Sequence, residues 1–443
     1  MILQGRLQRL RSLLELAIPV VAGNVGIMVM GLVDLLFVGK VGPIDIGAIG
    51  VSHAAFSWVM IFGVGLLAGL EFLMARSFGA GDEEASRKYL AQGLRISLFA
   101  GVLLSAALWG SAQFLELFGF NPDVLPKTQR SLEILALGLL PVLGFTTLRI
   151  FLQSRNQTRE AVIALIAANL LNAALNAVLV TGEWGFPRWE AIGSVTATVA
   201  SRWLMFLVLI PASMRAAGGV LPFEADLRRM KETLRLGLPS AIQMAFEVGG
   251  FAFVTGLAGK LSSTQLAAHQ IVLNVASLAF MVPMGISSAA AVRVGQWLGK
   301  GASREAILTG WMSFAVAGVY AVFSASVFVF LGEPILSFYT TDSAVLSAGA
   351  GLLGLAALFQ FSDGAQVVAT GVLRGVADTR SPAYANGIGH WLVGVPLGYY
   401  LCFVQGTEAR GLWMGLSVGL TVVAIMLLIA WGFRARSYRK ASD

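Results

Sequence analysis

The chain has 443 residues, of which 57% are apolar and only 12% are charged. Soluble proteins contain roughly 45–50% apolar and about 25% charged residues, so this composition excludes a disordered chain and a soluble multidomain protein. The formal net charge of +7 comes from Lys and Arg residues that are spread between apolar runs rather than gathered into one basic block, and we therefore expect no nucleic-acid partner.

Charge-poor stretches recur along the whole chain, and about 20 apolar residues are enough to span the hydrocarbon core of a bilayer as a helix. Continuous apolar runs such as 317–331 lack the alternation that is typical of membrane β-barrel strands. We therefore expect an all-α polytopic membrane protein with twelve transmembrane helices. In chain order they lie near 14–39, 47–75, 90–115, 131–151, 161–182, 190–214, 236–259, 266–292, 307–331, 347–373, 383–404 and 411–433.

The positive charges predict which side of the membrane each loop faces. With both termini in the cytoplasm, 24 of the 31 Lys and Arg residues lie on the inner side and six lie outside. This bias agrees with the positive-inside rule, so we predict a multi-pass protein of the plasma (inner) membrane. The remaining one, Arg202, falls within a helix, where we expect it to snorkel to the interface or to pair with a carbonyl group.

The two halves of the chain repeat each other at a spacing of 220 residues, which aligns Pro19 with Pro239 and Gly39 with Gly259. Six helices per half is an even number, so both halves enter the membrane from the same side and form a parallel repeat. The predicted domains are an N-lobe at 1–214 (helices 1–6), a cytoplasmic linker at 215–235, and a C-lobe at 236–443 (helices 7–12) with a basic tail.

Three carboxylates lie where the bilayer core disfavours charge. Asp34 belongs to the first predicted helix, Glu247 to the seventh and Asp363 to the tenth, and none has Lys or Arg three or four residues away. An ionisable group in the core costs at least about 2.5–3.5 kcal/mol on insertion scales, so each indicates an ion or substrate site. The alternative is a structural hydrogen bond to a neighbouring helix.

Polar side chains accompany Asp363 at helical spacing. Gln360, Gln366 and Thr370 recur with it at intervals of three or four residues and form one stripe along the tenth helix. Such a stripe is typical of a helix face that lines water or substrate.

The fifth predicted helix carries Asn169, Asn172 and Asn176 at a similar spacing of three or four residues. Their amide oxygens are suited to coordinate a cation or to stand beside a carboxylate such as Asp34. Simple interhelical hydrogen bonding, worth about 0.6 kcal/mol per contact, explains the pattern equally well.

Pro19 shares the first predicted helix with Asp34. A proline inside a helix removes a backbone hydrogen bond and can create a hinge. We therefore expect charge changes at Asp34 to be coupled to a bend at Pro19, unless the equivalent Pro239 marks a packing feature of the repeat.

Enzyme signatures are missing from the sequence. It contains neither the nucleotide-binding G-x-x-x-x-G-K-[ST] motif nor H-E-x-x-H, and its single cysteine, Cys402, excludes a thiolate metal site. We expect a protein that is not an enzyme. A flippase of lipid-linked precursors is one alternative, although it should carry more cationic residues in its cavity. A membrane-embedded transferase is the other, but it should show paired acids for a metal on a loop.

Three groups of residues resemble the multidrug and toxic compound extrusion (MATE) family of twelve-helix antiporters. They are the Gly-x-Gly loops after the second and eighth helices, the segment Phe246-Glu247-Val248, and the segment DGAQVVATGVLRG at 363–375. The resemblance covers nearly the whole chain. It implies two six-helix lobes, no cofactor, and efflux of cationic or amphipathic small molecules in exchange for inward Na⁺ or H⁺. We expect a monomer whose other partner is membrane lipid.

Carried over to the C-lobe, the resemblance implies that Glu247 and Asp363 lie in a cavity that binds substrate or a cation. We include Gln360, Gln366 and Phe359 in this predicted site. Phe359 stands where some bacterial members carry a tyrosine, so this chain offers no phenol oxygen there.

Carried over to the N-lobe, the resemblance implies an ion site formed by Asp34 and a helix-five asparagine, which we assign to Asn176, and to which we add Asn172. A Na⁺ ion is expected either at Asp34 and Asn176 or at Glu247 and Asp363. Pro19 is the expected hinge.

Overall fold

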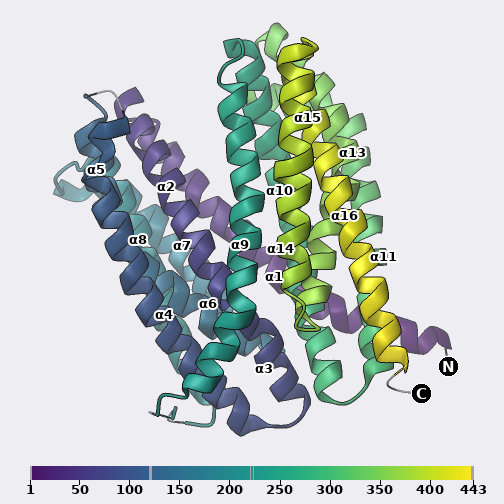
Figure 1. The fold of residues 1–443 in the computed structure, drawn as a ribbon. Coiled ribbons are helices and arrows are strands. Elements are labelled where there is room, and N and C mark those ends of the chain that lie inside the picture. Colours follow the sequence, from purple (N-terminus) through teal and green to yellow (C-terminus); the bar gives the residue numbers. More distant parts are fainter. Residues whose placement is uncertain (1, 119–121, 220, 223, 441–443) are drawn as a thin grey trace. The chain divides into compact units, whose positions relative to one another are not determined.

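The structure is a computed structural model that describes residues 2–118, 122–219, 221–222 and 224–440. In this part of the chain, 12 helical spans are long and apolar enough to cross a membrane (Figure 1). The predicted all-α class and the predicted number of spans are thereby confirmed. The spans are Leu7–Val38, Pro43–Gly79, Glu83–Ala112, Leu125–Ser154, Arg159–Leu179, Glu190–Ala216, Leu227–Ala258, Ser263–Gly299, Ser303–Phe330, Ser343–Arg374, Arg380–Val404 and Glu408–Lys440.

Most spans are single helices, but three of them are divided. The second breaks at Ala68, and the fourth breaks at Leu137 and Gly138. The eleventh alternates between α-helix and π-helix, and Pro396 lies in its α-helical part, where the missing backbone N–H disturbs the usual bonding pattern. The helices are α1 (Ile2–Val38), α2 (Pro43–Leu67), α3 (Gly69–Gly79), α4 (Glu83–Ala112), α5 (Leu125–Ala136), α6 (Leu139–Ser154), α7 (Arg159–Leu179), α8 (Glu190–Ala216), α9 (Leu227–Ala258), α10 (Ser263–Gly299), α11 (Ser303–Phe330), α12 (Gly332–Tyr339), α13 (Ser343–Arg374), α14 (Arg380–Asn386), α15 (Val395–Tyr399) and α16 (Glu408–Lys440).

The chain divides into two compact units at points inside helices rather than inside loops. The first unit comprises Met1–Val21 with Leu238–Asp443, and the second comprises Ala22–Gly237. The boundaries therefore fall within α1 and within α9, in each case within two residues of a proline (Pro19 and Pro239). This division differs from the lobe boundaries expected from the sequence.

Direct contacts explain why the start of α1 belongs to the first unit. Arg9 forms an ion pair with Glu305 of α11 at 2.6 Å. The guanidinium of Arg293 in α10 donates two hydrogen bonds to the carbonyl oxygen of Ser12, at 3.0 and 2.8 Å. At these positions α1 is held by helices of the second half of the sequence.

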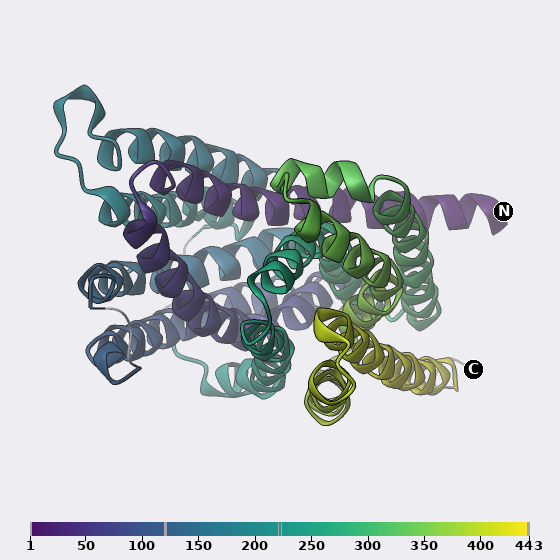
Figure 2. The ribbon, with the colours of Figure 1, turned by 90° about the horizontal axis from the view of Figure 1, so that it is seen from above.

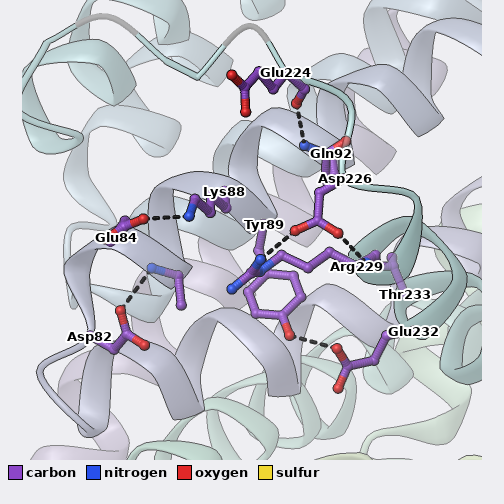
Figure 3. A network of polar contacts seen from close by, with 11 residues as sticks. Asp82, Glu84, Lys88, Tyr89, Gln92, Glu224, Asp226, Arg229, Glu232 and Thr233 are labelled. Carbon is purple, nitrogen blue, oxygen red and sulfur yellow. Dashed lines mark hydrogen bonds and ion pairs between the residues drawn. The ribbon is translucent and has the colours of Figure 1, made fainter.

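The segment between α8 and α9 is shorter than the predicted linker, because α8 continues to Ala216 and α9 begins at Leu227. Figure 3 shows its contacts within the second unit. Gln92 of α4 donates to the carbonyl oxygen of Glu224 at 3.2 Å, and Tyr89 donates to Glu232 at 2.7 Å. Asp226 caps the start of α9, and hydrogen bonds from the backbone and then the side chain of Arg229 lower the pKa of Asp226.

Each unit has its own packing centre. In the first unit α13 packs against α10, α11 and α16, and α16 also runs beside α15 (Figure 2). In the second unit α7 packs along α8, while α4 packs against α6. These pairings place the intramembrane polar residues of α7 and α8 on adjoining helices.

A close approach between α10 and α13 gives a stability prediction. A Cβ atom at Gly371 would lie 2.2 Å from the carbonyl oxygen of Ser287, whereas a Cβ atom at Gly354 of the same helix meets nothing within 4 Å. Gly371→Ala should destabilise the protein by about 1–3 kcal/mol through overpacking. Gly354→Ala should instead stabilise the helix by roughly 0.5–1 kcal/mol. Thermal unfolding of both detergent-solubilised variants shows whether each Tm lies below or above that of wild type. Equal Tm values for the two variants would contradict the close packing at Gly371.

Candidate functional site

Asp34 is the centre of a buried polar cluster in the second unit, with only 1% of its surface exposed. Its Oδ1 atom accepts hydrogen bonds from the side-chain amides of Asn172 at 2.9 Å and Asn176 at 2.8 Å. Its Oδ2 atom accepts a hydrogen bond from the hydroxyl of Thr198 at 2.5 Å. Side chains from α7 and α8 thus hold a carboxylate of α1, and all three donors are neutral.

The structure brings together three residues of the predicted N-lobe site and adds one that the sequence analysis missed. The four-residue spacing of Asn172 and Asn176 places both amides on the face of α7 that meets Asp34. Asn169 does not join them, because its amide donates to the carbonyl oxygen of Leu165 in its own helix. Thr198 was missed, although it belongs to a run of small hydroxyl residues in the predicted sixth helix.

The cluster has a donor set that suits a small hard cation. Within the described residues, the side-chain oxygens of Asn172 and Asn176 are buried and have no hydrogen-bond partner. Because the amide nitrogens face Asp34, both amides would have to turn for their oxygens to join its carboxylate around an ion. Carboxylate and amide oxygens are the ligands that hard cations prefer. Among the described residues, no group of three or more His, Cys, Asp and Glu side chains forms a site for a metal ion.

Arg202 was expected to snorkel to the interface or to pair with a carbonyl group, and among the described residues its guanidinium packs against an aromatic ring rather than a carbonyl group. Its guanidinium carbon lies 4.0 Å from the centre of the Phe56 ring. Its Nη1 atom is buried and has no hydrogen-bond partner in the described part of the chain. Arg202 interacts electrostatically with Asp34, but the two side chains form no ion pair.

A second acidic cluster lies in the first unit, around Glu247 of α9. Gln243, one turn earlier in the same helix, donates to its Oε2 atom at 2.6 Å. Gln366 of α13 donates to its Oε1 atom at 2.8 Å. Sequence analysis included Gln366 but missed Gln243, for which the four-residue spacing to Glu247 was the available signal.

Asp363 is 3% exposed and belongs to the same cluster. It interacts electrostatically with Glu247 and with Gln366, the residue whose amide donates to Glu247. Gln360 is also buried, and its Nε2 atom has no hydrogen-bond partner. Arg374, near the end of α13, interacts electrostatically with Glu247 and was not singled out from the sequence.

Phe359 and Pro19 take no part in the hydrogen bonds that the described residues form around the two acid clusters. Phe359 is buried in the apolar core of the first unit, with its ring centre 5.6 Å from that of Trp413 and 6.0 Å from that of Phe251. Pro19 lies inside α1, which continues through it from Ile2 to Val38. The structure therefore places Phe359 among the aromatic rings of the apolar core and shows no break in the helix at Pro19.

Two buried acid clusters within twelve membrane spans define a class of protein. Ionisable groups at membrane depth mark pathways for ions or substrates, and in this chain each cluster is completed by amide or hydroxyl groups. The fold and the clusters are those of a polytopic membrane transporter.

Comparisons with known proteins give the family. The sequence model of the MatE family matches residues 19–178 and again residues 239–400, so its two matches begin 220 residues apart. The chain is 34% identical over 440 residues to multidrug resistance protein PmpM of Pseudomonas aeruginosa. The aligned region covers 97% of this chain and 92% of PmpM. This chain belongs to the MATE family of multidrug efflux transporters.

Further relatives agree with this assignment. Multidrug resistance protein MdtK of Edwardsiella ictaluri is 33% identical over 430 residues, covering 95% of this chain and 94% of MdtK. The crystal structure of the eukaryotic MATE transporter AtDTX14 shares the fold with a TM-score of 0.88 at 23% identity, covering 99% of this chain and 100% of that chain. The predicted family is confirmed. Its members are transporters of small molecules rather than enzymes, and this one is a multi-pass inner-membrane protein.

Proposed function

We propose that this protein is a secondary antiporter that exports cationic or amphipathic compounds in exchange for inward Na⁺ or H⁺. The observation that carries the proposal is the presence of two separate buried carboxylate clusters, each contacted by neutral amide or hydroxyl donors. Such carboxylates attract a cation, and the chain supplies one cluster for each of two cations.

The two clusters take different roles in this proposal. Asp34 binds the coupling ion, with Asn172 and Asn176 supplying amide oxygens if that ion is Na⁺. Glu247 and Asp363 bind the positive charge of the substrate. Gln360, Gln366 and Phe359 complete that site, because glutamine amides offer hydrogen bonds and an aromatic ring attracts a cation through its face.

Exchange then follows from differential binding. A ligand shifts a conformational equilibrium only if it binds the two states with different affinity. In our proposal the coupling ion favours the state that releases substrate, and the substrate favours the other state. The protein works as a monomer in which both termini are cytoplasmic, and the two ends of the described chain lie at the same end of the first unit (Figure 1).

Efflux from living cells tests the function. Cells that express the protein and are loaded with a fluorescent cationic dye should lose the dye faster than cells with an empty vector. Collapsing the transmembrane ion gradients with ionophores should remove the difference. Efflux that continues at the same rate without any gradient would contradict a secondary antiporter.

Pro19 is the proposed hinge in α1 through which ion binding at Asp34 changes the shape of the N-lobe cavity. Ion binding bends α1 and ion release straightens it, so Pro19→Ala should favour the straight form by restoring a backbone hydrogen bond. We expect slower turnover with little change in substrate affinity, measured as the rate and the half-saturating concentration of dye transport.

Pro239→Ala is the matched control for this hinge, because Pro239 holds the equivalent position in α9. It should slow turnover less than Pro19→Ala does. If the two variants slow turnover equally, or if neither does, both prolines are packing features of the repeat and the hinge is wrong.

A further inference from the structure

Arg202 is a charged residue inside a membrane span that none of the proposed steps uses. It lies within α8, and its guanidinium rests against the ring of Phe56 on α2. A buried Nη1 atom without a hydrogen-bond partner is costly in a protein interior. Charged residues at membrane depth are rare and are commonly functional, so Arg202 requires an explanation.

The position of Arg202 in α8 relates it to the Asp34 cluster. Thr198, which donates to Asp34, lies exactly four residues before Arg202, and residues four apart lie on the same face of a helix. Arg202 interacts electrostatically with Asp34, although the two form no ion pair. The guanidinium is therefore a positive charge one helical turn from Thr198, the residue that donates to Asp34, and it interacts electrostatically with the carboxylate without an ion pair.

We propose that the positive charge of Arg202 keeps Na⁺ from binding at the Asp34 site. This inference rests on the proposed role of Asp34 in binding the coupling ion. Arginine remains charged in proteins, and in a site that excludes bulk water its repulsion of a second cation is stronger than in solution.

The repulsion acts on both H⁺ and Na⁺, but the two ions differ in what compensates it. A proton forms a covalent bond to one carboxylate oxygen and needs no further ligand. Na⁺ must be surrounded by several oxygens, and in this cluster the amide nitrogens of Asn172 and Asn176, not their oxygens, point at Asp34. Na⁺ therefore faces the charge of Arg202 and also requires both amides to turn.

One other titratable group faces the same place. His53 of α2 interacts electrostatically with both Arg202 and Asp34, and its Nε2 atom is buried without a hydrogen-bond partner. The test below is therefore made at one fixed pH, so that the charge of His53 does not vary between salts.

Na⁺ binding is measured by thermal unfolding of the purified full-length protein in detergent, in NaCl and in KCl of equal ionic strength. A ligand that binds only the folded state raises the Tm. For wild type, the difference in Tm between NaCl and KCl should equal that of Asp34→Asn. For Arg202→Met, the Tm in NaCl should rise further above the Tm in KCl. The double variant Arg202→Met with Asp34→Asn should lose this additional rise in Tm.

Two further variants separate charge from packing. Arg202→Lys keeps the positive charge and should behave as wild type, even if its overall Tm is lower. Arg149→Met removes a comparable arginine of α6, which interacts with Glu71 rather than with Asp34, and should gain no Na⁺ response. The proposal is overturned if Arg202→Met shows no Na⁺-specific rise, or if wild type shows one that Asp34→Asn removes.

Transport gives an independent readout. In proteoliposomes with equal pH on both sides, an imposed Na⁺ gradient should leave wild-type dye transport unchanged and should accelerate Arg202→Met by about tenfold, the order expected for removing one like charge from a partly buried site. Na⁺-driven transport by wild type would overturn the role of Arg202. Absence of wild-type transport with any ion gradient would instead contradict the proposed antiport, while the Tm measurement would still test Arg202.

Discussion

Asp363→Asn and Glu247→Gln should each abolish efflux of cationic dyes while the protein still folds and inserts. Each change keeps the shape of the side chain but removes its charge. Two unit charges about 4 Å apart attract by about 4 kcal/mol at an effective dielectric constant of 20, so we expect a loss of at least about 100-fold in transport efficiency. Dye efflux from cells, normalised to the amount of protein in the membrane, measures this loss.

Asp342→Asn is the control for these two variants. Asp342 caps the start of α13, the helix that carries Asp363, and accepts hydrogen bonds from the backbone of Ala344 and Val345. Asparagine caps helices about as well as aspartate, so this variant should transport normally. Normal efflux by Asp363→Asn or by Glu247→Gln would remove that residue from the substrate site.

Asp34→Asn should uncouple transport from the ion gradient without a large effect on substrate binding. The amide cannot bind a proton at physiological pH and is a poorer ligand for Na⁺ than a carboxylate. Because the substrate is proposed to meet Glu247 and Asp363, its affinity for the detergent-solubilised protein should stay within about threefold, or less than 0.7 kcal/mol. Dye binding by fluorescence polarisation, set beside gradient-driven transport in vesicles, compares the two effects.

Asp82→Asn is the matching control in the same unit. Asp82 caps α4 through a hydrogen bond from the backbone of Ala85 at 2.8 Å, a role that asparagine also fills. It should leave binding and transport unchanged. If Asp34→Asn weakens dye binding as strongly as it weakens transport, then Asp34 belongs to the substrate site.

The twelve spans were predictable because long apolar runs without charge have few alternatives in a protein of this composition. The pairing of Asp34 with Asn172 and Asn176 was also accessible, since a four-residue spacing places two amides on one face of α7. Gln243 was within reach of the sequence, because it lies four residues before Glu247 in the same helix. Thr198 was harder to predict. A Thr hydroxyl in a helix commonly bonds to a carbonyl oxygen of its own helix, and only the packing of α8 against its neighbours shows that this one reaches Asp34.

The unit boundaries and the setting of Arg202 depend on contacts that the sequence pattern does not contain. The repeat correctly aligned Pro19 with Pro239, but it gave no sign that α1 and α9 are each divided between two units. That division rests on contacts such as Arg9 with Glu305, which are 296 residues apart in the chain. Arg202 was expected to snorkel to the interface or to pair with a carbonyl group, whereas its guanidinium packs against the ring of Phe56 and interacts electrostatically with Asp34.

Transport by the purified protein in vesicles tests the central claim most directly. Proteoliposomes are loaded with buffer that contains no nucleotide and are diluted into a cationic dye. Either an H⁺ gradient or a Na⁺ gradient is then imposed alone, first in one direction and then in the other. The antiport account predicts that dye accumulates against its own gradient when one of these ion gradients is imposed, and that the direction of dye movement reverses when that gradient is reversed. Dye movement that ignores the direction of both gradients, or that requires ATP, would contradict it.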